Sequence, residues 1–72
     1  MREKIIALME EIFQVSAGTV TEATKAEDLE EWDSLAHVML IDALDSELGI
    51  SIPLDEAVEI SSVAEIFEKA GV

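Results

Sequence analysis

The stretch Glu30-Glu31-Trp32-Asp33-Ser34-Leu35 marks the boundary between a polar segment and a long helical pattern. Before it, residues 16–31 show no sustained hydrophobic period. After it, apolar residues recur at helical spacing up to Leu48, and Gly49 follows as a stop signal, which predicts a helix that begins near Ser34. Asp33 or Ser34 is a natural N-cap for this helix. The serine hydroxyl would then stand at the positive end of the helix dipole, where a phosphate is stabilised.

The predicted helix from Ser34 to Leu48 has two faces of different character. On a helical wheel at about 100° per residue, its core stripe contains His37, Leu40, Ile41, Leu44 and Leu48. The opposite side holds Leu35, Val38, Met39, Asp42, Asp45 and Ser46. Single apolar residues are common on protein surfaces, but an apolar strip beside aspartates also suits transient docking, and methionine adapts to several partners. We therefore expect Val38 and Met39 to be exposed and to form, with Asp42 and Asp45, a partner-binding surface.

The motif at this helix start resembles the prosthetic-group attachment motif of acyl carrier proteins, which have Asp-Ser-Leu at the start of their second helix. The similarity continues through Leu48-Gly49, Ile52-Pro53 and Ile60-Ser61-Ser62-Val63, and it covers essentially the whole chain. It implies that Ser34, flanked by Asp33 and Leu35, carries a 4′-phosphopantetheine whose thiol holds an acyl group as a thioester. It also implies a carrier without catalytic activity, which a phosphopantetheinyl transferase modifies and which acyl-loading and acyl-processing enzymes visit.

The sequence departs from the carriers of fatty-acid synthesis at two positions. Those carriers usually have an acidic residue just after Asp-Ser-Leu and another three positions later, where this chain has Ala36 and Met39. The docking strip is therefore more apolar, which favours a dedicated carrier of a specialised lipid, polyketide-like or amino-acyl pathway over one of bulk fatty-acid synthesis. Peptidyl carrier domains commonly have a Gly-Gly-x-Ser motif, and Trp32-Asp33-Ser34-Leu35 is more similar to the acyl branch.

Three further segments have helical patterns. A first amphipathic helix is expected from Arg2 to Val15, a short one from Asp55 to Ile60, and a last one from Val63 to Ala70. The residues expected in the core from the first and last of these are Ile5, Leu8, Met9, Ile12, Phe13, Val15, Val63, Ile66, Phe67 and Ala70. Val20 and Leu29 should hold residues 16–31 to that core, and Ser62 and Glu65 have the spacing of a capping box. The expected fold is all-α, a small four-helix bundle of three longer helices and one short helix, in a single domain over residues 1–72.

Composition limits the partners of this chain. Its 72 residues include 17 acidic and 4 basic ones, for a net charge of −13, and no cysteine. An anion of this density is repelled by nucleic acid and by anionic lipid, so basic docking surfaces on partner proteins are the expected targets. Without cysteine there is no disulfide and no thiolate metal site, and any reactive thiol must come with a cofactor. No apolar run has the form of a signal peptide or a membrane span, and we expect a cytoplasmic monomer.

Other interpretations of the motifs have less support. Asp33, Ser34 and His37 are spaced like a hydrolytic triad, but the chain has no Gly-x-Ser-x-Gly elbow and little room for an oxyanion hole. We instead expect His37 at the edge of the core, hydrogen-bonded to the first loop. The acids between Glu27 and Glu31 lack the Asp-x-Asp-x-Asp-Gly order of a calcium loop, so no metal site is expected.

The alternative to a carrier is a non-covalent adaptor, a helical module that docks a partner through Val38 and Met39. Replacing Ser34 by alanine distinguishes the two functions. A carrier loses all function with that hydroxyl, whereas an adaptor loses only the contribution of a helix cap, about 1 kcal/mol.

The net charge of −13 leads to a prediction about stability. Repulsion among the carboxylates opposes the compact state, and salt screens exposed charges that lie more than about 10 Å apart at 0.1 M ionic strength. Thermal unfolding at neutral pH, followed by circular dichroism, should therefore shift to higher temperature when sodium chloride is raised from low to moderate concentration. A melting temperature that does not respond to salt would contradict this explanation.

Overall fold

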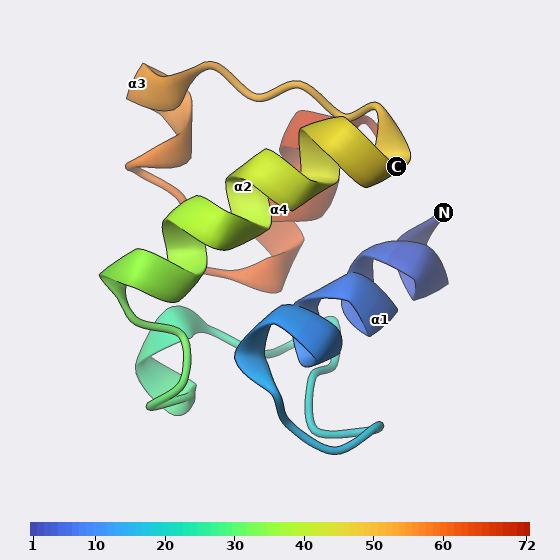
Figure 1. Ribbon diagram of the computed structural model, residues 1–72, viewed down its shortest axis with the longest axis vertical. Coiled ribbons are helices and arrows are strands. Elements are labelled where there is room, and N and C mark those ends of the chain that lie inside the picture. The colour runs from blue at the N-terminus through green and yellow to red at the C-terminus, as the bar shows by residue number, and fades with distance from the viewer.

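Four α-helices and one short 3₁₀ helix make up the computed structural model, which describes residues 1–72 (Figure 1). They are α1 (Arg2–Phe13), η1 (Ala26–Asp28), α2 (Ser34–Leu48), α3 (Leu54–Ala57) and α4 (Val63–Ala70). The expected all-α bundle of three longer helices and one short helix is confirmed. None of these helices is long and apolar enough to cross a membrane.

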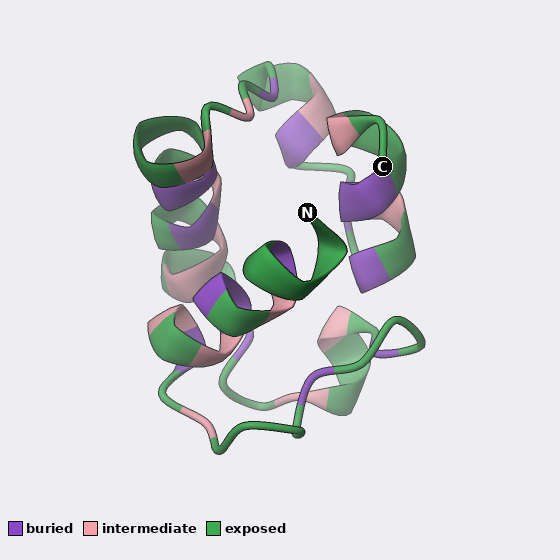
Figure 2. Cartoon of the chain, turned by 90° about the vertical axis from the view of Figure 1, so that its right-hand side faces the viewer, coloured by how far each residue is buried: buried purple, intermediate pink, exposed green.

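One face of each helix fills the core. Buried residues recur along α1, α2 and α4, and they alternate with exposed ones (Figure 2). The core contains Ile5, Leu8, Met9, Phe13, Val20, Trp32, Leu40, Ala43, Leu44, Ile52, Ala57, Ile60, Val63, Ile66 and Phe67. Six residues expected there are only partly buried, because they pack at its edge: Ile12, Val15, Leu29, Ile41, Leu48 and Ala70. The helical pattern thus identified the correct faces and overestimated their width.

The first helix ends at Phe13, two residues before the predicted end at Val15. Gln14 adopts a left-handed conformation with φ of 58°, and the amide of Val15 then donates to the carbonyl of Glu10 at 3.1 Å. This pattern closes the last turn of the helix. The Glu10 carboxylate also accepts hydrogen bonds from the amides of Gly18 and Val20 at 2.7 and 3.1 Å, so it turns the following loop back along α1.

The loop between α1 and α2 is also held to the start of α4. The amide of Ala26 donates to the carbonyl of Ser61 at 2.8 Å, and the amide of Val63 donates to the carbonyl of Thr24 at 3.0 Å. These two bonds surround an isolated antiparallel bridge between Lys25 and Ser62. The expectation that Val20 holds this loop to the core is confirmed, because Val20 is buried.

The short helix α3 covers Leu54–Ala57, whereas the sequence pattern predicted a helix from Asp55 to Ile60. The helix begins one residue earlier because the carbonyl of Pro53 already accepts the amide of Ala57 at 2.8 Å. It ends earlier because the amides of Glu59 and Ile60 bond three residues back instead of four, which tightens the chain into turns. Ile60 is buried after these turns, so its apolar character reflects tertiary packing.

The start of α4 differs in one detail from the predicted capping box. The Ser62 hydroxyl accepts a hydrogen bond from the amide of Glu65 at 3.2 Å, as expected. The Glu65 carboxylate, however, accepts from the amide of Ser61 at 3.2 Å, one residue before the cap. It also accepts from the hydroxyls of Ser61 and Ser62, each at 3.0 Å. These hydrogen bonds, that of the Ser61 amide foremost, hold the pKa of Glu65 below its ordinary value of 4.5.

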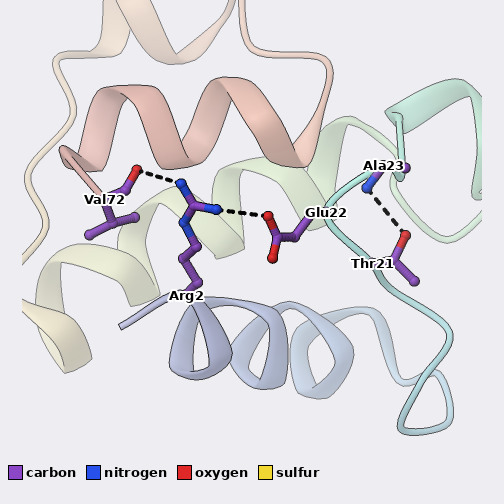
Figure 3. A network of polar contacts seen from close by, with 5 residues as sticks. All are labelled: Arg2, Thr21, Glu22, Ala23 and Val72. Atoms are coloured by element: carbon purple, nitrogen blue, oxygen red, sulfur yellow. Dashed lines mark hydrogen bonds and ion pairs between the residues drawn. The ribbon is translucent and has the colours of Figure 1, made fainter.

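The two ends of the chain meet through Arg2 (Figure 3). Its guanidinium donates to the Glu22 carboxylate at 2.8 Å and to the carbonyl of Val72 at 3.3 Å. The same group lies over the ring of Phe67, 5.0 Å from its centroid. Exposed ion pairs contribute little to stability, but these contacts bring the first turn of α1 beside the end of α4.

Replacing Glu65 by glutamine should lower the melting temperature at neutral pH, because a neutral amide is a weaker acceptor for these donors than a carboxylate. Since the folded-state pKa of Glu65 is lowered, its stabilisation is complete above pH 4.5 and is lost as the pH falls through the folded-state pKa. The difference in melting temperature between wild type and Glu65→Gln should therefore shrink as the solution is acidified below pH 4.5.

The control is Glu68→Gln, which removes the same charge from an exposed residue of α4. A melting temperature of Glu65→Gln that follows the Glu68→Gln control at every pH would show that the hydrogen bonds of Glu65 contribute nothing.

Candidate functional site

The start of α2 leaves the Ser34 hydroxyl free. Asp33 is the N-cap, and its carboxylate accepts a hydrogen bond from the amide of Ala36 at 2.8 Å. Its carbonyl accepts the amide of His37 at 2.9 Å. Ser34 is exposed, and its hydroxyl makes no hydrogen bond within the protein, nor do the amides of Ser34 and Leu35. One exposed hydroxyl and two free amides therefore stand together at the positive end of the α2 dipole.

Trp32 is the residue at this site whose role the sequence analysis missed. Only 6% of its surface is exposed, and its ring packs against that of Phe13 with centroids 5.3 Å apart. Because Trp32 is buried two residues before Ser34, it fixes the position at which α2 begins. The residue type could have indicated this burial. The only tryptophan of the chain adjoins the motif, and large aromatic side chains are mostly buried.

His37 lies at the edge of the core, half-buried, as predicted. Because Trp32 belongs to the loop between α1 and α2, the expected hydrogen bond of His37 to the first loop is confirmed. Its Nδ1 accepts the indole Nε1–H of Trp32 at 2.9 Å, and its Nε2 lies 2.7 Å from the carbonyl oxygen of Ala57 at the end of α3. The helical wheel identified the side of α2 on which His37 lies, but not the distant element opposite it. With both ring nitrogens engaged in these bonds, His37 does not contact the Ser34 hydroxyl, and no triad forms.

Two hollows lie beside α2 and share His37, Val38 and Val58 in their walls. The first, of about 320 Å³, adjoins Ser34 and is also lined by Ala26, Trp32, Asp33 and Ile60. The second, of about 260 Å³, separates α2 from α3 and is also lined by Ile41, Asp42, Asp45, Ser51, Ile52, Leu54 and Ala57. Two adjoining hollows therefore lie along α2, and only the first of them reaches Ser34.

The predicted exposure of Val38 and Met39 is confirmed, with 60% and 47% of their surfaces accessible. Leu35 of α2 and Leu54 and Val58 at α3 are exposed as well. These five residues, which we call the apolar surface, lie on the two helices that border the hollows. Asp42 and Asp45 of α2 are also exposed, and no lysine or arginine lines either hollow. No group of three or more histidine, aspartate or glutamate side chains is arranged to hold a metal ion.

Comparison with known proteins identifies the family. The model of the phosphopantetheine attachment site family matches residues 3–68. The acyl carrier protein of Thermosynechococcus vestitus is 39% identical over 67 residues, which cover 92% of this chain and 82% of that protein. The chain belongs to the acyl carrier protein family. This membership decides against the adaptor interpretation, and it makes the protein a carrier of acyl groups on phosphopantetheine and not an enzyme.

The fold of this acyl carrier protein agrees with that of a solved structure. The solution NMR structure of the holo acyl carrier protein from Geobacter metallireducens aligns with a TM-score of 0.83 at 24% sequence identity. The alignment covers 97% of this chain and 80% of that chain. At this identity the likeness supports the helical fold.

The residues at the start of α2 fit a covalently attached phosphopantetheine. A phosphodiester requires a hydroxyl that an enzyme can reach, and the exposed Ser34 hydroxyl has no competing partner. The negative phosphate is stabilised by free amides at a helix N-terminus, and the amides of Ser34 and Leu35 have no acceptor within the protein. The Asp33 side chain is turned into its cap with Ala36, so it does not compete for these two donors.

Proposed function

We infer that Ser34 is the residue to which this acyl carrier protein attaches its phosphopantetheine. The observation that carries this proposal is the exposed Ser34 hydroxyl, without a partner, at the capped start of α2. When bound, the group supplies a flexible arm whose thiol holds an acyl group as a thioester. The other serines of the chain lack this combination: Ser62 is the N-cap of α4, and the Ser61 hydroxyl donates to Glu65.

The residues around Ser34 each have a defined part in this function. Asp33 fixes the first turn of α2 through its cap, and Leu35 projects into solvent with 71% of its surface exposed. Trp32 anchors the preceding segment, so that a modifying enzyme meets Ser34 in one fixed orientation. The carboxylates of Asp42 and Asp45 on the same helix attract basic docking surfaces and speed up encounter.

The apolar surface supports the proposal that this carrier works in a dedicated pathway. Met39 stands where carriers of fatty-acid synthesis usually have an acid, and it is exposed beside Leu35 and Val38. A partner that binds this chain must bury these side chains, which favours a complementary apolar patch over a purely basic one. The proposed partners are therefore a phosphopantetheinyl transferase and a small set of acyl-loading and acyl-processing enzymes of a specialised lipid, polyketide-like or amino-acyl pathway.

The attachment site is tested by the Ser34→Ala variant. Incubation of the wild-type chain with a promiscuous phosphopantetheinyl transferase and coenzyme A should add the mass of one phosphopantetheine, measured on the intact protein, and Ser34→Ala should add none. Because Asp33 and not Ser34 caps α2, the variant should unfold at nearly the wild-type temperature. Ser46→Ala, at an exposed serine of the same helix, is the matched control and should be modified normally. Modification of Ser34→Ala would show that the wrong serine has been assigned.

The apolar surface is tested by Met39→Glu. An exposed substitution should change the free energy of unfolding by no more than about 0.5 kcal/mol, whereas the loss of a buried methionine costs about 2–5 kcal/mol. Enzymes of bulk fatty-acid synthesis should acylate the variant faster than the wild type, because the added carboxylate restores an acid that they recognise. A dedicated partner should bind it more weakly.

Ala7→Glu is the matched control, since Ala7 is exposed on α1 and away from the apolar surface. It adds the same charge and should leave both acylation rates unchanged. If Met39→Glu behaves like Ala7→Glu with both sets of enzymes, the proposal of a dedicated partner loses its support.

A further inference from the structure

The hydrogen bonds of His37 permit only one protonation state of its ring. An indole N–H is a donor only, so Nδ1 must offer a lone pair to Trp32 at 2.9 Å. A carbonyl oxygen is an acceptor only, so Nε2 must carry the proton that it donates to Ala57 at 2.7 Å. The ring is therefore neutral, with its single proton on Nε2.

This ring joins three segments that otherwise have few polar links. Trp32 belongs to the segment before α2, His37 to the first turn of α2, and Ala57 to the end of α3. The bond from His37 to Ala57 is the only hydrogen bond between α2 and α3. The side chains of α3 hold it weakly, because Leu54 and the adjacent Val58 are 73% and 68% exposed. The remaining attachments are the buried Ala57 and an exposed ion pair from Glu56 to Lys69 at 2.9 Å.

A second proton on His37 is incompatible with this arrangement. It would have to bind Nδ1, where it would meet the indole N–H of Trp32 across the present 2.9 Å contact. Two donors cannot share a hydrogen bond, so the ring must turn away from Trp32. Nε2 is on the same rigid ring, and such a turn also withdraws it from the carbonyl of Ala57.

The charged groups around His37 favour an outward movement of the protonated ring. On α2, Asp42 and Asp45 line the hollow between α2 and α3 together with His37, and Asp33 lines the hollow beside Ser34. The acids in and after α3, namely Asp55, Glu56 and Glu59, line neither hollow, and no lysine or arginine does. On the inner side, Trp32 packs against the uncharged ring of Phe13. An imidazolium is therefore attracted by the aspartates that line the two hollows, whereas the Trp32–Phe13 pair offers it no charge.

We propose that the protonation state of His37 controls whether α3 is held against α2. In its neutral form it holds α3 against α2 and limits the width of the hollow between these two helices. In its protonated form it releases Trp32 and Ala57, so that α3 separates from α2 and the hollow widens. These hydrogen bonds involve only residues of the chain itself, so the proposal does not require that Ser34 be modified.

The experiment makes three NMR measurements on the unmodified chain, which contains a single tryptophan and a single histidine. Ring nitrogen shifts of His37 should report the Nε2–H form at about pH 8. On acidification, the Trp32 indole N–H resonance should move together with the ring nitrogen resonances of His37. Hydrogen exchange of the Ala57 and Val58 amides, corrected for the intrinsic effect of pH, should become faster by about tenfold, as the loss of one hydrogen bond predicts. The amides of α1 should keep their protection.

Two variants separate His37 from the many carboxylates that also titrate. In His37→Gln, the side-chain oxygen and amide can take the places of Nδ1 and Nε2, but the group does not titrate, so the exchange of α3 should no longer depend on pH. In Trp32→Phe, protonated His37 meets no opposing donor and can keep its bond to Ala57. The hydrogen exchange of the α3 amides should therefore again be independent of pH.

The proposal is overturned by any of three results. They are an Nδ1–H ring at the higher pH, exchange of α3 in the wild type that is unaffected by pH, and the same pH dependence in His37→Gln or Trp32→Phe as in the wild type. The first two results concern the wild-type chain, so the proposal remains testable if a variant fails to fold.

Discussion

The Trp32 indole lies between Phe13 of α1 and His37 of α2, with ring centroids 5.3 and 6.1 Å away. This contact holds an exposed segment in place, because Asp33, Ser34 and Leu35 directly after Trp32 are all exposed. An exposed motif has no packing of its own, so its position depends on the nearest buried residue. Trp32 also donates to His37, and through His37 the same anchor reaches α3. One buried aromatic ring therefore positions the exposed start of α2 and the helix opposite it.

Much of this arrangement could be predicted from local sequence. The periodicity of Leu40 and Leu44 located the buried face of α2, and both are fully buried. The same wheel turned Val38 and Met39 towards solvent, where they lie. The cap by Asp33 and the stop at Gly49 follow from side-chain and backbone chemistry within a few residues of each helix end. These features are predictable because the atoms that determine them are close together in the chain. The assignment of a function came from the resemblance of the motif and not from these patterns.

The features that were missed depend on contacts between distant segments. The second partner of His37, the carbonyl of Ala57, is 20 residues away, and no property of α2 alone indicates it. The loop before α2 pairs with the segment before α4, and no local pattern in either segment indicates this pairing. Glu65 prefers the amide of Ser61 over that of Ser62, a choice of one residue that depends on how the chain enters α4. In a chain of this size a helical pattern gives the face of an element, whereas its ends and polar partners are set by its neighbours.

The contact of Arg2 with Val72 has a consequence for the connectivity of the chain. Both views of the molecule show the two ends of the chain near one another, and Figure 1 shows the start of α2 on the opposite side. The order of the helices along the sequence is therefore not dictated by their packing. A linker of a few residues could join the ends, and the chain could be opened at an exposed loop instead, giving a circular permutant with the same core. A neighbouring domain or a tether attached to either end would therefore lie on the side of the molecule opposite the start of α2.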